Sequence, residues 1–316
     1  MIHKTLLFVL LGLGICRAQN NRKPLQILVG HKNAVNCIDI SADGKSLISG
    51  SKDETIRIWN LNDYSLTKTI NGNPSSIKSL KFNNAGDKFL AGFYEGFADF
   101  NFPSGKLNKK KKKAHDGFVE TACYSSDNQL ILTSSWRENT LKVWNAPKFK
   151  KQIELDETVW VDNACFNHSA TIILSGGHDN KVKLWNVVTG KMIQSFTAHN
   201  DWVYMVKFSA DEKYVYSASL DKTIKIWEVE TGKNIATLEG HTDGVITFDI
   251  SSSGQYLVSS GLDKQVIIWD LKTKQIVEKF NAHLEPIYVV KFSKDGKTIL
   301  TASKDATIKV WENSYQ

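Results

Sequence analysis

The sequence predicts an all-β fold, a seven-bladed β-propeller of four-stranded antiparallel blades, from three observations. The first is a period of 42 residues, since steps of 42 from His31 meet histidine at positions 115, 199, 241 and 283. Repetition at about 40–45 residues indicates one structural unit built many times. The second is a parallel series of aromatic residues spaced 41 to 44 apart: Trp59, Phe100, Trp144, Trp185, Trp227, Trp269 and Trp311.

The third observation is the pattern inside one unit. Between residues 200 and 241, four short runs rich in β-branched and aromatic residues occupy 202–208, 214–219, 223–227 and 234–238. Turn residues separate these runs, and no stretch has the 3.6-residue period of a helix. Seven such units arranged radially leave only short, protected strand edges.

The two ends of the repeat predict how the ring closes. The last unit stops just after Trp311, before a fourth strand, whereas residues 25–29 precede His31 where every other unit has its outer strand. We therefore expect the segment 25–29 to pair with the last three strands. The expected organisation is a signal peptide at 1–18, a short N-terminal linker at 19–24 and one propeller domain at 25–316.

The first 18 residues have the layout of a secretory signal peptide. Lys4 supplies a positive charge, residues 6–15 are apolar, and Cys16 and Ala18 are the small residues expected before a cut at Gln19. Ten apolar residues are too few for a comfortable membrane span. We expect an exported protein, secreted or periplasmic, with no stable membrane span after cleavage. An uncleaved anchor is the alternative.

Charge and cysteine content argue against two further classes of protein. The formal charge is +7, but Lys4 and Arg17 belong to the expected signal peptide and the run 109–113 contributes five lysines, so the rest is close to neutral. This basic strip on an outer strand either protects that strand edge or attracts an acidic partner, and it does not predict nucleic-acid binding. Three cysteines remain after cleavage, an odd number that argues against a disulfide framework.

Two dipeptides in the repeat resemble the signature of the WD-repeat family. They are Gly240-His241 near the start of a unit and Trp269-Asp270 near its end, and the resemblance extends over every unit. It implies a hydrogen-bonded tetrad of histidine, Ser or Thr, Asp and tryptophan inside a blade. We expect these residues to be structural, because orphaning a buried polar group costs about 1–3 kcal/mol. The complete sets expected are His31, Ser51, Asp53 and Trp59; His199, Ser219, Asp221 and Trp227; and His283, Ser303, Asp305 and Trp311.

Four units depart from this tetrad. The fourth has Glu157 and Gly177, so we expect an incomplete network there. The sixth has Gly261 where Ser is expected, and an insertion in the third leaves Glu138 at the Asp position. The second unit keeps the pattern of four strands, so we expect it to form a blade that lacks the hydrogen-bonded tetrad. Its tetrad positions hold Asn73, Gly92, Tyr94 and Phe100.

The resemblance also implies where a partner binds. In this family the turns that hold the histidine and the Asp emerge on one face of the disc, around the central channel. Large aromatic residues gather at the outward positions of these turns, and such residues dominate binding hot spots. Alternatively, some of them fill the channel mouth or cover a neighbouring blade. The predicted partner-binding residues are Phe93, Phe118, Trp136, Trp160, Trp202, Tyr204 and Tyr288, with Lys52, Lys78 and Lys304 as a basic rim.

These residues predict a non-catalytic scaffold that binds a protein segment or peptide. The alternative is an exported propeller that binds a carbohydrate or other small ligand. Only His168 and His178 are spare histidines after cleavage, and the chain has no nucleophile elbow, paired-cysteine metal motif or Gly-rich phosphate loop. Glu120 and Asp162 can approach each other at the channel mouth, where a polar rim explains them as well as catalysis does. We expect no enzyme activity, no metal and no cofactor.

Overall fold

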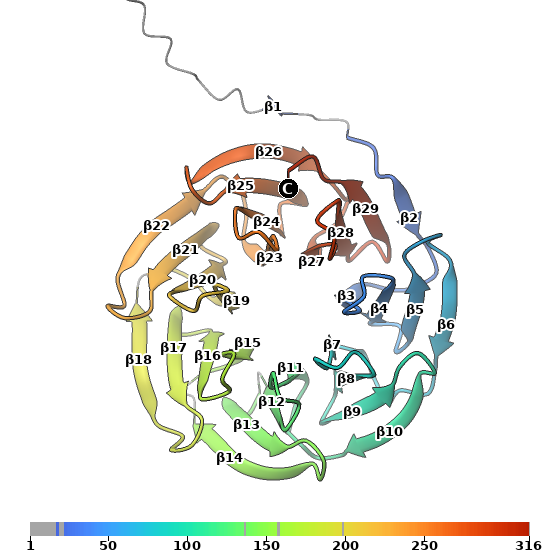
Figure 1. The fold of residues 1–316 in the computed structure, drawn as a ribbon, viewed down its shortest axis with the longest axis vertical. Helices are drawn as coiled ribbons and strands as arrows, with labels where there is room; N and C mark the ends of the chain where they lie inside the picture. The colour runs from blue at the N-terminus through green and yellow to red at the C-terminus, as the bar shows by residue number, and fades with distance from the viewer. Residues whose placement is uncertain (1–16, 19–21, 136, 157–158, 198, 316) are drawn as a thin grey trace, which may run out of the picture.

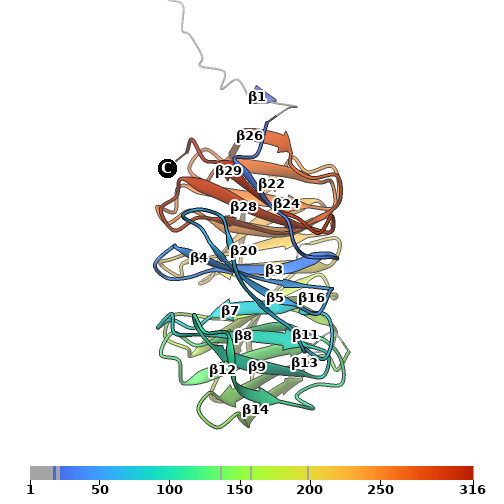
Figure 2. The same ribbon diagram turned by 90° about the vertical axis from the view of Figure 1, so that its right-hand side faces the viewer.

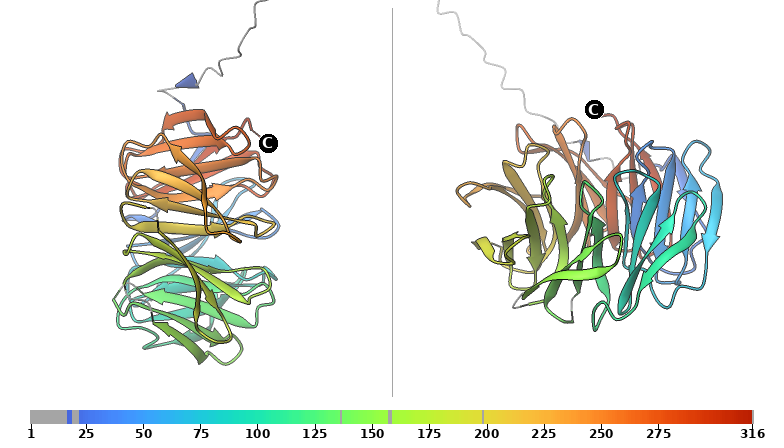
Figure 3. Two further views of the ribbon diagram at one scale, coloured as in Figure 1. Left: turned by 90° about the vertical axis from the view of Figure 1, so that its left-hand side faces the viewer. Right: turned by 60° about the horizontal axis from the view of Figure 1, so that its bottom comes forward.

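The computed structural model confirms the predicted seven-bladed β-propeller. It describes residues 17–18, 22–135, 137–156, 159–197 and 199–315. The strands form seven sheets that stand around one axis, with the first strand of each blade innermost (Figure 1). Seen from the side, the blades make a disc (Figure 2; Figure 3). We call the side that carries the histidine turns the histidine face, and the opposite side the hairpin face.

Each blade is an antiparallel sheet of four strands in sequence order, except that blade seven takes its outer strand from the N-terminal segment. The strands are β3 (Val35–Ile40), β4 (Ser46–Ser51), β5 (Ile56–Asn60) and β6 (Leu66–Ile70) in blade one; β7 (Ser79–Phe82), β8 (Lys88–Phe93), β9 (Gly96–Asn101) and β10 (Lys106–Lys111) in blade two; β11 (Val119–Tyr124), β12 (Leu130–Ser135), β13 (Thr140–Asn145) and β14 (Lys150–Asp156) in blade three; β15 (Val161–Phe166), β16 (Ile172–Gly177), β17 (Lys181–Asn186) and β18 (Met192–Thr197) in blade four; β19 (Val203–Phe208), β20 (Tyr214–Ser219), β21 (Thr223–Glu228) and β22 (Asn234–Glu239) in blade five; β23 (Val245–Ile250), β24 (Tyr256–Gly261), β25 (Gln265–Asp270) and β26 (Gln275–Asn281) in blade six; and β27 (Ile287–Phe292), β28 (Thr298–Ser303), β29 (Ile308–Glu312) and β2 (Gln26–Leu28) in blade seven.

The hydrophobic core lies between the blades. Both faces of the second strand are buried, because neighbouring sheets cover it from either side. One cluster joins Ile224 and Leu238 of blade five to Phe248 and Trp269 of blade six. Burial of a large apolar side chain contributes about 1.5–3 kcal/mol, so each junction between blades is held mainly by such contacts.

Side chains on the innermost strands link one blade to the next. These strands have one edge toward the central axis, so their peptide N–H groups need partners outside the sheet. The backbone N–H of Ala122 donates to Ser79 Oγ at 2.9 Å, and that of Ala164 donates to Thr121 Oγ1 at 3.2 Å. Asn163 accepts from the Val206 N–H in the same way at 3.2 Å. A polar residue at one repeat position therefore connects successive blades.

The N-terminal strand closes the ring as the repeat predicted. β2 pairs antiparallel with β29, with Gln26 opposite Val310 and Leu28 opposite Ile308. Arg22, in the segment expected to be a plain linker, lies 2.6 Å from the Glu278 carboxylate of β26. Backbone pairing also joins β1 (Arg17–Ala18) to β26, in parallel. The rest of the predicted signal peptide lies outside the described residues.

The lysine strip 109–113 begins in the outermost strand of blade two, where the sequence placed it, and its last two residues follow the end of β10 at Lys111. Three of its ammonium groups lie over aromatic rings, at 5.1 Å from the centre of Phe149, 4.9 Å from Phe93 and 5.2 Å from Trp144. Two of these rings belong to blade three, so the strip packs across a junction between blades. Such cation–π contacts contribute about 0.5–1 kcal/mol each where they are exposed.

Among the residues that the structure describes, no helix is long and apolar enough to cross a membrane.

Candidate functional site

The tetrads form, but with a different hydroxyl from the expected one. In blade five, His199 Nδ1 lies 2.7 Å from Asp221 and Nε2 lies 2.7 Å from Ser217 Oγ. Trp227 Nε1 donates to the same Ser217 oxygen at 2.8 Å. Ser219 instead donates to the Asp201 carbonyl and accepts from the Asp221 N–H. The prediction of Ser219 was therefore wrong by two residues.

The same shift applies to the other two predicted sets. Ser49 replaces Ser51 in blade one, and Thr301 replaces Ser303 in blade seven. The reason is strand geometry. The β4–β5 pairing ends at Gly50 opposite Ile56, so Ser51 lies beyond the paired stretch, whereas Ser49 Oγ accepts from Trp59 Nε1 at 2.8 Å. Residues two apart share a face of a strand, which is why spacing alone did not distinguish them.

With the hydroxyl two residues earlier, blade six has a complete tetrad, although the sequence had put that tetrad in doubt. Gly261 of blade six occupies the position of Ser51, so His241, Asp263, Ser259 and Trp269 still form a full tetrad. In blade three, Glu138 takes the place of Asp and lies 2.7 Å from His115. Blade four retains the bond from Trp185 to Ser175, while Glu157 lies outside the described residues. Blade two keeps its four strands, as predicted.

Burial lowers the pKa of three tetrad histidines and so favours their neutral form. It lowers the pKa of His115 to about 4, despite the opposing effect of Glu138, and it lowers the pKa of His31 and His283 as well. Burial alone raises the pKa of Asp53, but hydrogen bonds from Lys32 and Thr55 outweigh it and hold that pKa at about 2. Both ring nitrogens of these histidines are bonded, so they act as structural connectors.

A compact aromatic cluster occupies the histidine face over blades four and five. We define the Trp160 cluster as Trp160, His178, Trp202 and Tyr204. The His178 ring stacks on Trp202 with centroids 3.9 Å apart and planes at 10°, and Trp160 meets it edge-on at 5.0 Å. Tyr204 completes the group at 6.3 Å. The two indoles are 39% and 37% exposed, so the predicted Trp160, Trp202 and Tyr204 lie together around a histidine that the sequence analysis had left unassigned.

Asp162 lies beside this cluster, in close contact with His178 but without hydrogen-bond geometry between the two atoms. Its Oδ2 atom lies 2.7 Å from Nε2 of His178, and both side chains are largely covered. Because the imidazole stacks on Trp202 and meets Trp160 edge-on, the cluster is packed before any partner arrives. Preorganised groups lose less entropy on binding. The sequence placed Asp162 at the channel mouth but did not pair it with His178.

The remaining predicted residues are distributed differently. Phe118 meets Tyr94 at 5.2 Å, and the Lys78 ammonium lies 5.2 Å from the Phe118 ring centre and 3.6 Å from Glu120. Phe93 was wrongly placed on this face: it is 2% exposed and packs in the core between blades one and two. The β8–β9 turn is tight, with Phe93 opposite Gly96, so Tyr94 emerges instead. Trp136 lies outside the described residues.

The cluster borders a depression of about 750 Å³ at the channel mouth. Glu120, Asp162 and Tyr204 line one side, and burial raises the pKa of Glu120, helped by the neighbouring Asp162. Burial also raises the pKa of Tyr204 to about 12, together with the nearby carboxylates. The opposite side holds Tyr288 and two exposed lysines, Lys52 and Lys304, and the Lys304 ammonium lies 3.5 Å from the Glu285 carboxylate. Charges of both signs therefore lie on both sides of the mouth.

Comparison with known families now decides the class of protein. The family model described as "WD domain, G-beta repeat" matches residues 22–60, 107–145, 152–186, 190–228, 232–270 and 274–312. The chain belongs to this WD-repeat family. The longest unmatched stretch between these repeats, 61–106, contains the first three strands of blade two, where the tetrad residues are replaced.

Several WD-repeat relatives match part of this chain. It is 31% identical over 202 residues to "Apoptotic protease-activating factor 1" of Rattus norvegicus, covering 58% of this chain and 15% of that protein. It is 25% identical over 191 residues to "Small ribosomal subunit protein RACK1" of Caenorhabditis elegans, covering 59% and 58%. The third, "Nuclear distribution protein nudF" of Aspergillus niger, is 26% identical over 183 residues, covering 57% and 41%. The matches thus span less than two thirds of these relatives' lengths.

The WD-repeat architecture and the described side chains limit the chemistry of this face. No group of three or more His, Cys, Asp or Glu residues in the described ranges could hold a metal ion. The tetrad histidines are occupied by structural bonds, and His178 is held between Asp162 and Trp202. The described side chains offer a ligand a partly exposed aromatic surface beside a mouth lined by charged and polar groups.

Proposed function

We propose that this chain is a binding platform for a protein segment or peptide that lies across the channel mouth. WD-repeat propellers are in general non-catalytic protein-interaction scaffolds, and the chain belongs to that family. The Trp160 cluster is the main contact in this proposal. The observation that carries it is the stack of Trp160, His178 and Trp202, which leaves two indoles more than one third exposed on one face.

Physical arguments favour the Trp160 cluster as a contact surface. Tryptophan and tyrosine are enriched at the few interface positions that supply most binding energy. Exposed aromatic surface is unfavourable in water, and its burial by a partner releases about 25 cal/mol per Å². The carboxylates and lysines around the mouth would orient a bound segment, because complementary potentials select direction and register.

The test is a double variant, Trp160→Ala with Trp202→Ala, used as bait for capture of partners from the extracellular fluid of the source cells. We expect the captured proteins to fall by at least tenfold, since two hot-spot residues are worth about 2 kcal/mol each. The matched control is Leu284→Ala, because Leu284 is 83% exposed just after a histidine turn and lies outside the cluster.

The melting temperature separates binding from packing. We expect the double variant to melt within about 2 °C of the parent protein, because both indoles are at the surface. A large fall in melting temperature with unchanged capture would show that the indoles are packing residues, and the proposal would be wrong. The carbohydrate alternative would be supported if the parent protein bound a glycan array, captured no protein partner, and lost the glycan binding in the double variant.

We further propose that the chain is exported through residues 1–18. The support is the charged, apolar and small-residue sequence of that segment. The test is N-terminal sequencing of the protein produced in its natural source. A mature chain that starts at Gln19 supports export, and a chain that retains Met1 contradicts it.

A further inference from the structure

The junction between blades one and two contains a pocket of about 250 Å³, which residues of both outer strands, β6 and β10, help to line. Its walls are mainly apolar and include Ile70 of blade one together with Phe93, Phe100 and Leu107 of blade two. Drug-sized ligands usually occupy pockets of roughly 300–1,000 Å³. This pocket is smaller than that range, so it suits a ligand with one ring system.

The pocket is open because blade two has smaller side chains than its neighbours at three repeat positions. Phe100 lies where the six other blades have tryptophan, and Asn73 lies where five of them have histidine. Ala98 occupies the position in β9 that corresponds to Arg57 in β5. An indole, an imidazole and a long basic chain are thus replaced by smaller groups at one junction.

Glycines just before the tetrad histidine position show the difference in space. A Cβ atom added to Gly30 of blade one would lie 2.4 Å from Arg57 and 3.3 Å from Trp59. One added to Gly240 of blade six would lie 2.9 Å from the tryptophan of that blade. In blade two, Gly72 lines the pocket with a φ of 80°, and a Cβ added there meets no atom of the described residues within 4 Å.

Lys110 lines the pocket with an ammonium group that has no hydrogen-bond acceptor among the described residues. In blades three, six and seven a lysine ammonium donates to the carbonyl before the tetrad histidine; these lysines are Lys142, Lys279 and Lys309. Lys279 lies opposite Ile267 in β26, as Lys110 lies opposite Ala98 in β10. Lys110 does not make the corresponding bond, and its ammonium lies 4.9 Å from the centre of the Phe93 ring.

The charge of Lys110 has no acidic neighbour to offset it. Within the described ranges Lys110 forms no ion pair. Burial lowers the pKa of Lys110, and repulsion by Lys112 lowers it further. A bound anion would oppose both effects, because an opposite charge favours the charged form of an ammonium group.

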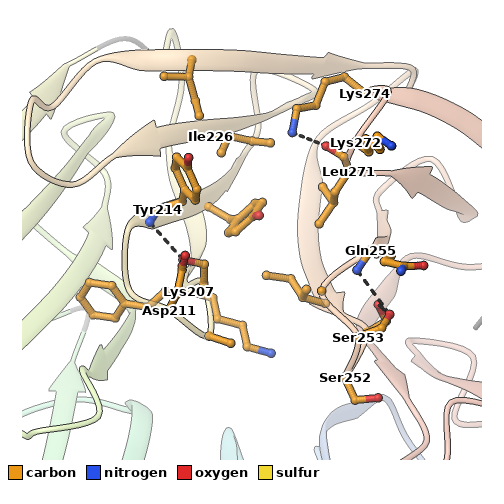
Figure 4. Close-up of a pocket in the computed structure, with 18 residues that line it drawn as sticks. Lys207, Asp211, Tyr214, Ile226, Ser252, Ser253, Gln255, Leu271, Lys272 and Lys274 are labelled. Carbon is orange, nitrogen blue, oxygen red and sulfur yellow. Dashed lines mark hydrogen bonds between the residues drawn. The ribbon is translucent and has the colours of Figure 1, made fainter.

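A larger groove on the hairpin face, between blades five and six, differs in this respect (Figure 4). Its volume is about 660 Å³, and its lysines have acidic neighbours. Lys207 lies 2.6 Å from Asp249. Burial lowers the pKa of Lys274, whereas the charge of Asp270 raises it. The two cavities therefore differ in charge as well as in size.

We propose that the pocket between blades one and two binds a small aromatic carboxylic acid. Its ring packs against Ile70, Phe93 and Phe100, in space that larger side chains fill in other blades, since aromatic rings pair well edge-on or offset. Its carboxylate pairs with the Lys110 ammonium. This site is separate from the binding platform, because none of its lining residues belongs to the Trp160 cluster.

The binding test is equilibrium dialysis of indole-3-acetate against the full chain. We expect saturable binding with a dissociation constant of about 1 mM or lower, which is within reach of a ligand of this size. Uncharged indole-3-acetamide should bind about three- to fivefold more weakly, because it cannot form the ion pair. Octanoate, which has the carboxylate but no ring, should also bind more weakly than indole-3-acetate.

Lys110→Gln tests the ion pair. It should weaken binding of indole-3-acetate about three- to fivefold and leave binding of indole-3-acetamide unchanged. The matched control is Lys106→Gln, since Lys106 is exposed on the same strand and does not line the pocket. This control should bind indole-3-acetate like the parent protein, as should the Trp160→Ala, Trp202→Ala double variant.

Ala98→Ile tests the cavity separately from the charge. Blade six already has isoleucine at this position, opposite a lysine, so the substitution has a precedent in the same repeat. We expect loss of measurable binding and a melting temperature equal to or above that of the parent protein. Phe100→Trp narrows the same space and serves as the second variant if Ala98→Ile lowers the melting temperature.

Unchanged binding of indole-3-acetate by a cavity-filled variant that melts like the parent protein would overturn the proposal. So would the absence of saturable binding by the parent protein, equal affinities for indole-3-acetate and indole-3-acetamide, or octanoate binding as tight as that of indole-3-acetate. None of these results would bear on capture of proteins by the Trp160 cluster, so the two sites are tested independently.

Discussion

At the scale of single residues, two adjacent serines in β24 illustrate how equal burial can have opposite energetic effects. Ser259 Oγ accepts from Trp269 Nε1 at 2.8 Å and bonds His241 Nε2 at 2.8 Å. Ser260 Oγ has no hydrogen-bond partner among the described residues. Both side chains are fully buried. The first hydroxyl therefore satisfies two other buried groups, whereas the second lost its bonds to water and gained none.

Ser259→Ala should lower the free energy of unfolding by about 1–3 kcal/mol, because it leaves the indole N–H and the imidazole without a partner. Ser260→Ala should change it by less than about 0.5 kcal/mol or raise it, because an unsatisfied hydroxyl is removed. Urea denaturation of the two variants measures both values. Equal destabilisation by the two substitutions would contradict this account of the tetrad.

Some residue positions in the tetrads and on the histidine face could be predicted from the sequence, and others could not. Histidine, Asp and tryptophan positions follow from the 42-residue period, and Glu138 was correctly placed after an insertion. The sequence predicted Ser51 as the tetrad hydroxyl, but the residue that bonds His31 is Ser49. Two residues on the same face of a strand cannot be distinguished until the strand pairing is known. Phe93 and Tyr94 were exchanged because a shorter turn cannot be read from spacing. The contact of His178 with Asp162 joins two turns of one blade, which no local pattern predicts.

At the scale of single elements, β2 is the outer strand of blade seven, although the other three strands of that blade lie at the opposite end of the chain. It supplies the fourth strand of blade seven, and Leu28 is buried in the cluster between blades seven and one. Its neighbour Val29 is 71% exposed. The sequence predicted this strand because the repeat lacks one strand at its end and has one too many at its start.

Deletion of residues 25–29 should lower the melting temperature of the whole domain, because it leaves the edge of β29 unpaired. The milder Leu28→Ala should cost about 2–5 kcal/mol by opening a cavity in the core. The control is Val29→Ala, which should have little effect. An unchanged melting temperature after the deletion would show that β2 does not contribute to closure.

At the scale of the whole molecule, the tetrads make stability depend on pH in one direction. His31, His115 and His283 have lowered pKa values, so their neutral forms stabilise the fold above an unfolded-state pKa of about 6.5. That stability is lost as pH falls from about 6.5 toward the folded-state pKa, which is about 4 for His115. Asp53 and Asp305, with pKa values of about 2, extend the loss below pH 4.

The free energy of unfolding should therefore fall steadily between pH 7 and pH 4. His115→Gln is less stable than the parent protein at pH 7.5, and this gap should shrink by on the order of 2 kcal/mol by pH 5, since one pKa unit corresponds to about 1.4 kcal/mol. Denaturant titrations at pH 7.5, 6 and 5 measure this difference. The control is the exposed His168→Gln, and a constant gap between parent and His115→Gln would contradict the prediction.

The pairing of β2 with β29 sets the order in which the molecule can be completed. Gln26 lies opposite Val310, 284 positions away in the sequence. The strand that leaves the ribosome first must wait for the last one, so six blades can assemble while blade seven is still open. During that interval β2 is unpaired, and the β29 strand of a second chain fits it as well as its own. Slow synthesis or crowding of nascent chains therefore favours exchange of this strand between molecules.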